Sequence, residues 1–247
     1  MMPFAAMRMR QGAVGPPDPS YSSVALLLHC DGTNGGTTFT DNSPTPKTVT
    51  PTICTTSTTQ VKYGTTSCAF PSSNPTEKLS IPHSADLAPT GDFTVEMWVY
   101  LTGTAGIQLR ALIWKSVSSG HTPYAMRLTA SVSPKIQVFA SNAAGSSFAI
   151  NMTGSITITT GSWHHIALTR SGSSYRLFVD GVLDVSGTNA GVGYVNAAHP
   201  VVIGNTTDDL YPLGSEGPAF QDDIRITNGV ARYTANFTPP TAAFPNF

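Results

Sequence analysis

Charged residues are scarce in this sequence. Asp, Glu, Lys and Arg make up only 11% of the 247 residues, and the formal net charge is -1. No basic patch is present that would indicate nucleic-acid binding. Ser, Thr, Gly and Pro instead fill the intervals between short apolar runs, and this composition is typical of a turn-rich β protein with a neutral polar surface.

Long apolar runs are also missing. The run from Val24 to Leu28 is far too short to span a bilayer. Within residues 1–20, Arg8 and Arg10 interrupt what would have to be the apolar stretch of a secretory signal. We therefore expect neither a membrane anchor nor an export signal. Sustained helical periodicity is absent as well, so the chain is expected to fold as β-structure.

Cysteine is too rare for a disulfide scaffold. The chain has three, Cys30, Cys54 and Cys68, and the odd number leaves at least one thiol unpaired. The simplest interpretation is that all three are reduced and at least partly buried, as small apolar side chains are. A bridge between Cys54 and Cys68 is the alternative. Zinc is not favoured, because no Cys-x-x-Cys pair accompanies them.

What the sequence does contain is a series of short strand-like runs. In the segment Phe93-Thr-Val-Glu-Met-Trp-Val-Tyr-Leu101, apolar residues alternate with Thr94, Glu96, Trp98 and Tyr100, which indicates a strand with one face in the core. Asp180-Gly181 separates two further runs and is a residue pair that favours a two-residue hairpin. Besides residues 93–101, the predicted strand-like runs are 24–30, 48–53, 67–70, 78–82, 111–115, 124–129, 135–140, 148–152, 163–170, 176–179, 182–185, 201–203 and 220–226.

These runs predict an all-β fold, a two-sheet antiparallel β-sandwich of one domain. Residues 1–20 are expected to form an extended N-terminal arm, because Gly15-Pro-Pro-Asp-Pro19 removes backbone donors and holds the chain near polyproline geometry. We assign the sandwich to residues 21–240 and an extended C-terminal tail to residues 241–247.

Eight short segments follow one another along the chain: Leu26-Leu-Leu-His-Cys-Asp-Gly32, Phe39-Thr-Asp41, Tyr63-Gly64, Gly91-Asp-Phe-Thr-Val-Glu-Met-Trp-Val99, Trp163-His-His-Ile-Ala167, Leu177-Phe-Val-Asp-Gly181, Ile203-Gly204 and Asp222-Asp-Ile-Arg-Ile226. In this order they resemble the laminin-G-like, concanavalin A-like lectin/glucanase jelly roll. The resemblance implies two stacked sheets, a calcium ion near one rim and a glycan groove on the concave face. The closing segment, residues 223–240, is similar in particular to versions of this domain in bacteriophage virion proteins.

Candidate binding residues fall into two groups. Sugars stack on aromatic rings while polar groups take the hydroxyls, so the candidate glycan-binding residues are Trp98, Tyr100, Trp114, Tyr124 and Tyr211. Each of these rings could equally serve core packing. By resemblance, the candidate calcium ligands are Asp31, Asp41, Asp222 and Asp223, with capping and turn formation as the alternative role. His164 and His165 point to opposite faces of a strand and cannot both ligate one metal.

Catalysis is not expected. Glucanases of this fold carry Glu-x-Asp-x-(x)-Glu on one strand, whereas the only glutamates here are Glu77, Glu96 and Glu216, and Trp98 follows Glu96 at the second position. A Gly-x-Ser-x-Gly elbow is also absent.

Two non-enzymatic functions remain. The first is a virion structural protein, a capsid decoration or cement protein on the surface of a phage particle, which residues 1–20 anchor to the major capsid protein or to tail proteins. The second is an adhesin on a tail fibre that binds host surface polysaccharide. The lack of shaft repeats and heptads favours the first. A bacterial surface module is less favoured without an export signal. A homo-oligomer is compatible with each, although no residue demonstrates one.

Overall fold

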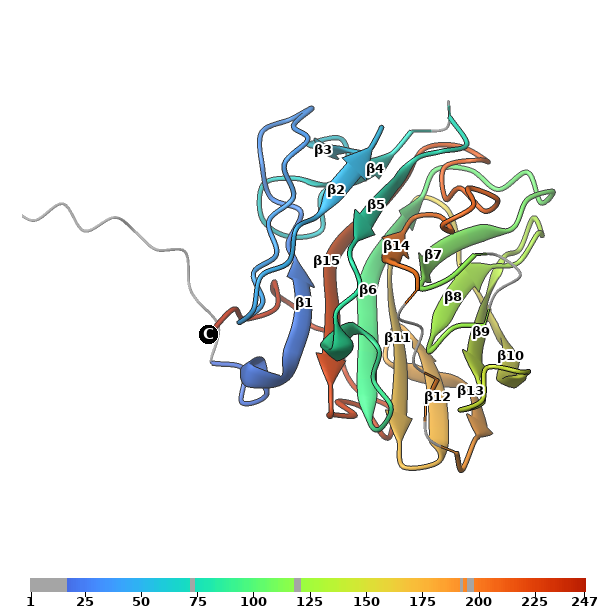
Figure 1. Ribbon diagram of the computed structural model, residues 1–247. Helices are drawn as coiled ribbons and strands as arrows, with labels where there is room; N and C mark the ends of the chain where they lie inside the picture. Colours follow the sequence, from blue (N-terminus) through green and yellow to red (C-terminus); the bar gives the residue numbers. More distant parts are fainter. Residues whose placement is uncertain (1–16, 72–73, 118–120, 192, 195–197) are drawn as a thin grey trace, which may run out of the picture.

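The fold is a sandwich of two antiparallel sheets (Figure 1). In this computed structural model we describe residues 17–71, 74–117, 121–191, 193–194 and 198–247. Sheet A has the strand order β13-β12-β11-β6-β15-β4-β3, with β1 also paired to β15; sheet B has the order β10-β9-β8-β7-β14-β5-β2. The prediction of a two-sheet antiparallel sandwich is confirmed.

Most strands coincide with the predicted runs, but β3 was not predicted and β10 is longer than predicted. Sheet A consists of β1 (Val24–Leu28), β3 (Thr55–Ser57), β4 (Ser67–Phe70), β6 (Phe93–Leu101), β11 (Trp163–Ser171), β12 (Ser174–Val179), β13 (Val182–Thr188) and β15 (Ala219–Asn228). Sheet B consists of β2 (Thr50–Thr52), β5 (Lys78–Ile81), β7 (Arg110–Trp114), β8 (Ala125–Leu128), β9 (Lys135–Ser141), β10 (Phe148–Thr157) and β14 (Val201–Ile203). Two short 3-10 helices, η1 (Tyr21–Ser23) and η2 (Ala85–Leu87), precede β1 and β6. None of the helices in the described part of the chain is long and apolar enough to cross a membrane.

The core lies between the two sheets. The alternate residues Phe93, Val95, Met97, Val99 and Leu101 of β6 enter it, each with at most 1% of its surface exposed. Asp180 and Gly181 form the predicted hairpin turn between β12 and β13, with φ of 50° and 77°. Cys30, Cys54 and Cys68 are buried and unbridged, so their predicted burial in the reduced form is confirmed.

Both ends of the described chain cover the outer face of sheet A. Phe244 is 3% exposed and packs with Val24 and Leu27, and the amide of Asp18 donates to the carbonyl of Phe247 over 3.1 Å. The C-terminus accordingly lies beside the start of β1 (Figure 1). Residues 241–247 are therefore attached to the fold through the buried ring of Phe244 and the carbonyl of Phe247, although most of their side chains are exposed. Of the predicted arm, residues 17–20 belong to the same covering layer, and residues 1–16 lie outside the described residues.

Residues 229–240 continue this layer over β6 and β11. The outward-facing hydroxyls of Thr94 and Thr169 donate to the carbonyls of Val230 and Tyr233, each over 2.9 Å. The rings of Tyr233 and Phe237 stack with their centroids 3.5 Å apart. This layer shields the outward face of β6 and β11 from water, which explains why the polar residues on that face are buried.

A buried charge network joins this layer to sheet A. Glu96 Oε1 accepts hydrogen bonds from Arg225 at 2.9 and 2.8 Å, and Glu96 Oε2 accepts one from the Tyr233 hydroxyl at 2.8 Å. Asp18 binds Arg225 at 3.1 Å and Arg232 at 2.7 Å. Burial alone would raise the pKa of Glu96, but the neighbouring Arg225, His165 and Arg232 lower it to about 2. The carboxylate is therefore ionised inside the protein.

Replacing Glu96 tests this network. Glu96→Gln leaves Arg225 buried without its main counter-charge, so the free energy of unfolding at pH 7 should fall by about 3–5 kcal/mol. Because the folded-state pKa lies below the ordinary value of 4.5, ionised Glu96 stabilises the fold above that pH and loses this effect as the pH falls toward 2. In urea unfolding, the difference in the free energy of unfolding between Glu96→Gln and the wild type should therefore decrease as the pH is lowered.

Asp209→Asn is the matched control. Asp209 pairs with Lys78 at 2.6 Å, but its side chain is 30% exposed, so the loss should stay below about 1 kcal/mol. A stabilising role of the ionised Glu96 would be contradicted if the two substitutions lowered the free energy of unfolding equally. It would also be contradicted if the loss in Glu96→Gln did not change with pH.

Candidate functional site

A row of aromatic side chains crosses the outer face of sheet B. Neighbouring ring centroids are separated by 6.0 Å (Tyr211 and Trp114), 5.4 Å (Trp114 and Phe139), 5.2 Å (Phe139 and Phe148), 5.4 Å (Phe148 and His121) and 6.5 Å (His121 and Tyr194). We call these six residues the aromatic row. On the outer face of sheet A, the two ends of the described chain cover much of β1, β6 and β11.

The strand register places the row. In β8 and β9 alternate residues such as Met126 and Val138 enter the core, so Arg127 and Phe139 point outward. Ala125 of β8 lies between Trp114 of β7 and Phe139 of β9 in the ladder. Its small side chain leaves room for the two large rings to meet across it.

Polar groups lie directly beside the rings. Arg127 Nε donates to Gln137 Oε1 over 2.9 Å, and Gln137 Nε2 donates to Asn151 Oδ1 over 3.1 Å. The guanidinium of Arg127 lies 4.7 Å from the ring centroid of Phe139 and 5.2 Å from that of Tyr211. Partial burial lowers the pKa of Arg127, but arginine remains charged at neutral pH. We call Arg127, Gln137 and Asn151 the polar ladder.

The row is partly accessible. Trp114 is 1% and Phe139 5% exposed, so these two rings form its floor. Tyr211, Phe148, His121 and Tyr194 are half-buried, and Asn151 is exposed. An apolar surface with a few placed hydrogen-bonding groups is the usual composition of a ligand-binding site.

The five predicted glycan-binding rings do not come together. Trp114 and Tyr211 belong to the aromatic row. Tyr124 is fully buried in the core, where its hydroxyl donates to the carbonyl of Leu87 over 2.9 Å; its prediction is corrected, because no face of the ring is open to a sugar. Trp114 is also buried, with 1% of its surface exposed, and packs beneath the more accessible rings of the row.

Trp98 and Tyr100 lie on the outer face of sheet A instead. Trp98 is 5% exposed and the ammonium of Lys62 lies 3.7 Å from its ring centroid. Tyr100 is half-buried between Trp163 and Phe220. Neither ring faces the aromatic row.

Sequence reasoning missed the other members of the row and the polar ladder. One signal was available for Phe139: in the run Lys135-Ile-Gln-Val-Phe-Ala-Ser141 it is an apolar residue out of phase with Ile136 and Val138. An aromatic ring at a position that should face outward is a candidate surface residue. His121 and Tyr194 lie outside the strands and gave no such signal.

The four predicted calcium ligands are already bonded within the fold. Asp41 accepts hydrogen bonds from the amides of Leu27, Ser43 and Lys47, and Asp31 accepts from the amide and hydroxyl of Thr65. No group of three or more His, Cys, Asp or Glu side chains that could hold a metal occurs among the residues described above.

Asp222 and Asp223 are bonded within the fold as well. Asp222 accepts from the amides of Lys62 and Tyr63 at 2.9 and 3.1 Å, and burial raises its pKa to about 7. Burial also raises the pKa of Asp223, although a hydrogen bond with His29 opposes the shift. A calcium ion held by these four residues stays a prediction.

The three glutamates all have roles in the fold. Glu96 is the centre of the charge network, and Glu216 accepts from the amides of Ile107 and Gln108, both at 2.7 Å. Burial raises the pKa of Glu77 to about 7, and its Oε1 accepts from the Gly214 amide. None of them faces the aromatic row, where a glycosidase would need a pair of carboxylates.

The fold and this surface define a jelly-roll protein with one covered sheet and one sheet that presents aromatic and polar side chains. The chain belongs to the concanavalin A-like lectin/glucanases superfamily, whose family model matches residues 73–232, more than half of its length. No curated protein matches the chain.

Solved structures with the same fold include binding domains of botulinum neurotoxins. The binding domain of serotype D superposes with a TM-score of 0.63 at 13% identity, covering 85% of this chain and 49% of that one. The receptor binding domain of the mosaic serotype C/D gives 0.61 at 13% identity, covering 89% and 49%. The binding domain of neurotoxin DC in complex with SialylT gives 0.59 at 12% identity, covering 84% and 48%. The present chain thus spans about half the length of these structures, and the likeness is one of fold.

Calcium titration tests the assignment of these acids. Because the carboxylates of Asp31, Asp41, Asp222 and Asp223 already accept hydrogen bonds from groups of the fold, adding calcium or a chelator should leave the thermal midpoint unchanged within about 1 °C. Differential scanning calorimetry of the full chain measures this. A midpoint that rises with calcium concentration, and does so less in Asp31→Asn, would support the calcium site.

Proposed function

We propose that this protein is a non-catalytic glycan-binding module and that the aromatic row with the polar ladder is its binding surface. The observation that carries the proposal is the direct contact of the two: Arg127 lies over Phe139 and Tyr211 and is hydrogen-bonded to Gln137. Rings and hydrogen-bonding groups are thus held within the span of one or two sugar residues.

This surface matches the chemistry of a sugar. The C–H faces of a sugar ring are apolar and stack on the accessible rings of Tyr211 and Phe148. Its hydroxyls both donate and accept hydrogen bonds, as do the amides of Gln137 and Asn151. Arg127 supplies only donors and would select oxygen acceptors. Since the ladder residues bond one another, they are oriented before a ligand arrives, which reduces the entropic cost of binding.

The structural neighbours support the same class of ligand. One is described as a binding domain in complex with SialylT, and another, at 11% identity, carries the description that cell entry of botulinum neurotoxin type C depends on interaction with two ganglioside molecules. Those properties belong to the neurotoxins. They support a glycan as the partner proposed for this chain, although a further neighbour, at 11% identity, is described in complex with rat synaptotagmin II.

A glycan array probed with the full chain tests the proposal. Arg127→Ala and Phe148→Ala should each weaken binding to the positive glycans roughly tenfold, on the order of 1.4 kcal/mol. Lys62→Ala is the matched control, since it also removes a cation that lies on an aromatic ring, Trp98, but on sheet A. A blank array for the wild type, or equal losses in Lys62→Ala and Arg127→Ala, would refute the proposed surface.

A finer proposal concerns where the module is displayed. We propose a bacteriophage particle, on which the chain serves as a capsid decoration protein or as the adhesive head of a tail fibre. Its support is the similarity of residues 223–240 to phage virion proteins. Mass spectrometry and immunogold labelling of particles from a phage that encodes this chain would test it, and absence from purified particles would exclude it.

The buried position of Asp18 sharpens the test of arm anchoring. A chain that begins at Pro17 keeps the bonds from Asp18 to Arg225 and Arg232, so it should stay as stable as the full chain while losing attachment to particles. A chain that begins at Tyr21 should lose about 3 kcal/mol or more, because two arginines are left without that carboxylate. Full particle occupancy by the chain starting at Pro17 would exclude anchoring through residues 1–16.

A further inference from the structure

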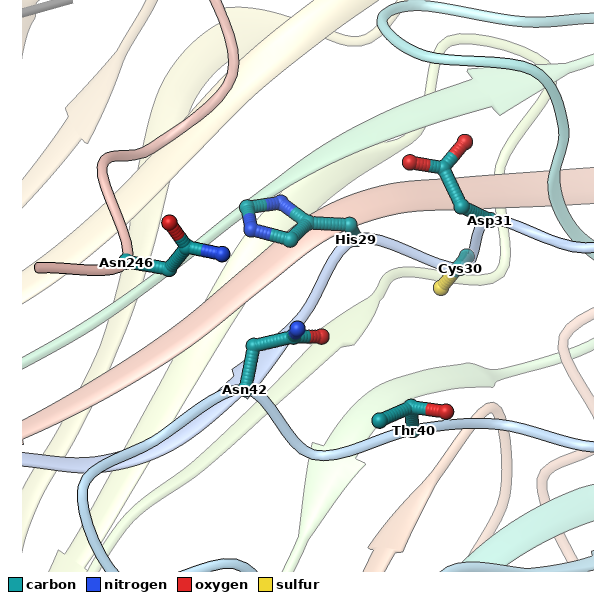
Figure 2. Close-up of a pocket in the computed structure, with 6 residues that line it drawn as sticks. All are labelled: His29, Cys30, Asp31, Thr40, Asn42 and Asn246. Atoms are coloured by element: carbon teal, nitrogen blue, oxygen red, sulfur yellow. The ribbon is translucent and has the colours of Figure 1, made fainter. Parts of the chain in front are cut away.

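A polar pocket lies at the end of β1, on the other side of the molecule from β8 to β10 (Figures 1 and 2). Its volume is about 310 Å³ and it is lined by His29, Cys30, Asp31, Thr40, Asn42 and Asn246. Three separate segments build it: the turn after β1, the loop that precedes β2, and the C-terminal layer. The aromatic row contributes no residue to it.

His29 is held in a fixed orientation within this pocket. Its Nδ1 lies 2.5 Å from Asp223 Oδ1, and the Asp223 side chain is 1% exposed. Burial alone would lower the pKa of His29, but the hydrogen bond and charge of Asp223 raise it. A histidine whose one nitrogen is bonded to a buried carboxylate presents its other nitrogen in a defined direction. Nε2 is therefore the atom that His29 offers to a ligand.

The other polar groups of the pocket have unused hydrogen-bonding capacity. Within the described chain, the side chains of Thr40, Asn42 and Asn246 and the Nε2 of His29 make no hydrogen bond to protein. Figure 2 shows the Asn246 amide directed toward the His29 ring. Asp31 differs, because its carboxylate is engaged by the amide and hydroxyl of Thr65.

This set of groups selects among ligand classes. Amides and a hydroxyl each donate and accept, and so does the hydroxyl group of a sugar. An anion would meet the carboxylates of Asp31 and Asp223 as well as His29, which weakens its attraction. A metal ion would need a group of three or more acidic, histidine or cysteine ligands of the kind that the described residues do not provide. A neutral, hydroxyl-rich ligand is the best match.

The pocket is not arranged for nucleophilic catalysis, although a thiol lines it. A hydrogen bond with Cys68 lowers the pKa of Cys30, but burial together with the nearby Asp222 and Asp223 carboxylates raises it overall. The thiol is 2% exposed and lies 3.9 Å from the carbonyl of Leu28. A protonated, buried thiol is unreactive, so the paired His29 and Asp223 have no nucleophile to activate.

We propose that this pocket is a second sugar subsite that takes one neutral monosaccharide unit through His29, Asn42, Thr40 and Asn246. The inference rests on the proposed function for the class of ligand, but it concerns a different surface. Its volume is near the lower end for ligand pockets, about 300–1,000 Å³, which restricts it to one ring at a time. Two such sites on opposite sides would let one molecule bridge two glycan chains or bind one chain twice.

Nuclear magnetic resonance of the ¹⁵N-labelled full chain tests the subsite. The probes are D-glucose, D-galactose, D-mannose and N-acetyl-D-glucosamine, each to about 50 mM, which detects dissociation constants in the millimolar range. At least one sugar should shift the side-chain amide signals of Asn42 and Asn246 and the ring signals of His29. The double variant Asn42→Ala, Asn246→Ala should raise the dissociation constant at least about tenfold. Its backbone spectrum reports whether it is folded.

Several outcomes would overturn the subsite. The proposal fails if none of the four sugars shifts these signals. It also fails if the sugar shifts the His29 ring signals of the double variant at the same concentrations as in the wild type. A third contradicting result is that inorganic phosphate binds the pocket more tightly than every sugar. Arg127→Ala separates the two sites, because it should leave the pocket shifts unchanged. Pocket shifts together with a blank glycan array would support the subsite and refute the surface on sheet B.

Discussion

The ionised carboxylate of Glu96 is the interaction on which the outer side of sheet A depends. It is fully buried between β11 and β15 and binds Arg225 and Tyr233. Taking a carboxylate and a guanidinium out of water is costly unless their bonds are completed. Asp18 from one end of the described chain and Arg232 from the other complete them. The network therefore requires both segments to be in place, and their apolar side chains then cover the sheet.

Much of this fold could be predicted from the sequence, because its strands obey a local rule. The alternation in β6 and the Asp180-Gly181 turn depend on neighbours in the chain, and both are found in the structure. The covering layer could not be predicted in this way. The segment of residues 241–247 has only seven residues and no alternating pattern, so it locally resembles a free tail. Their burial depends on Phe244 reaching Val24 and Leu27, a contact between opposite ends of the sequence that no periodicity reveals.

The candidate site shows the same limit more sharply. Trp114 and Tyr211 were identified by residue type, but their meeting depends on the loop after β14 returning to β7, where the amide of Ala111 donates to the carbonyl of Tyr211 over 2.8 Å. Phe139 and Arg127 are adjacent to Trp114 only through the order β9-β8-β7 of sheet B. The calcium assignment could not be derived from the sequence for a different reason. An aspartate that caps a loop and an aspartate that binds a metal have the same sequence signature, and what distinguishes them is whether backbone amides already occupy the carboxylate.

One irregularity in β15 connects these parts of the molecule. The register of β15 against β6 shifts between Asp222 and Arg225, and Asp223 adopts φ of 47°. A bulge redirects the side chains on either side of it. Here Asp222 binds the amides of residues 62 and 63, and Asp223 binds the imidazole of His29 and the amide of Phe244. Arg225 binds the carboxylate of Glu96. A regular strand would alternate these side chains between two faces and could not supply all three. The raised pKa values of Asp222 and Asp223, which burial causes, are the energetic cost of this arrangement. The bulge thus both anchors the layer that closes sheet A and orients the histidine of the polar pocket.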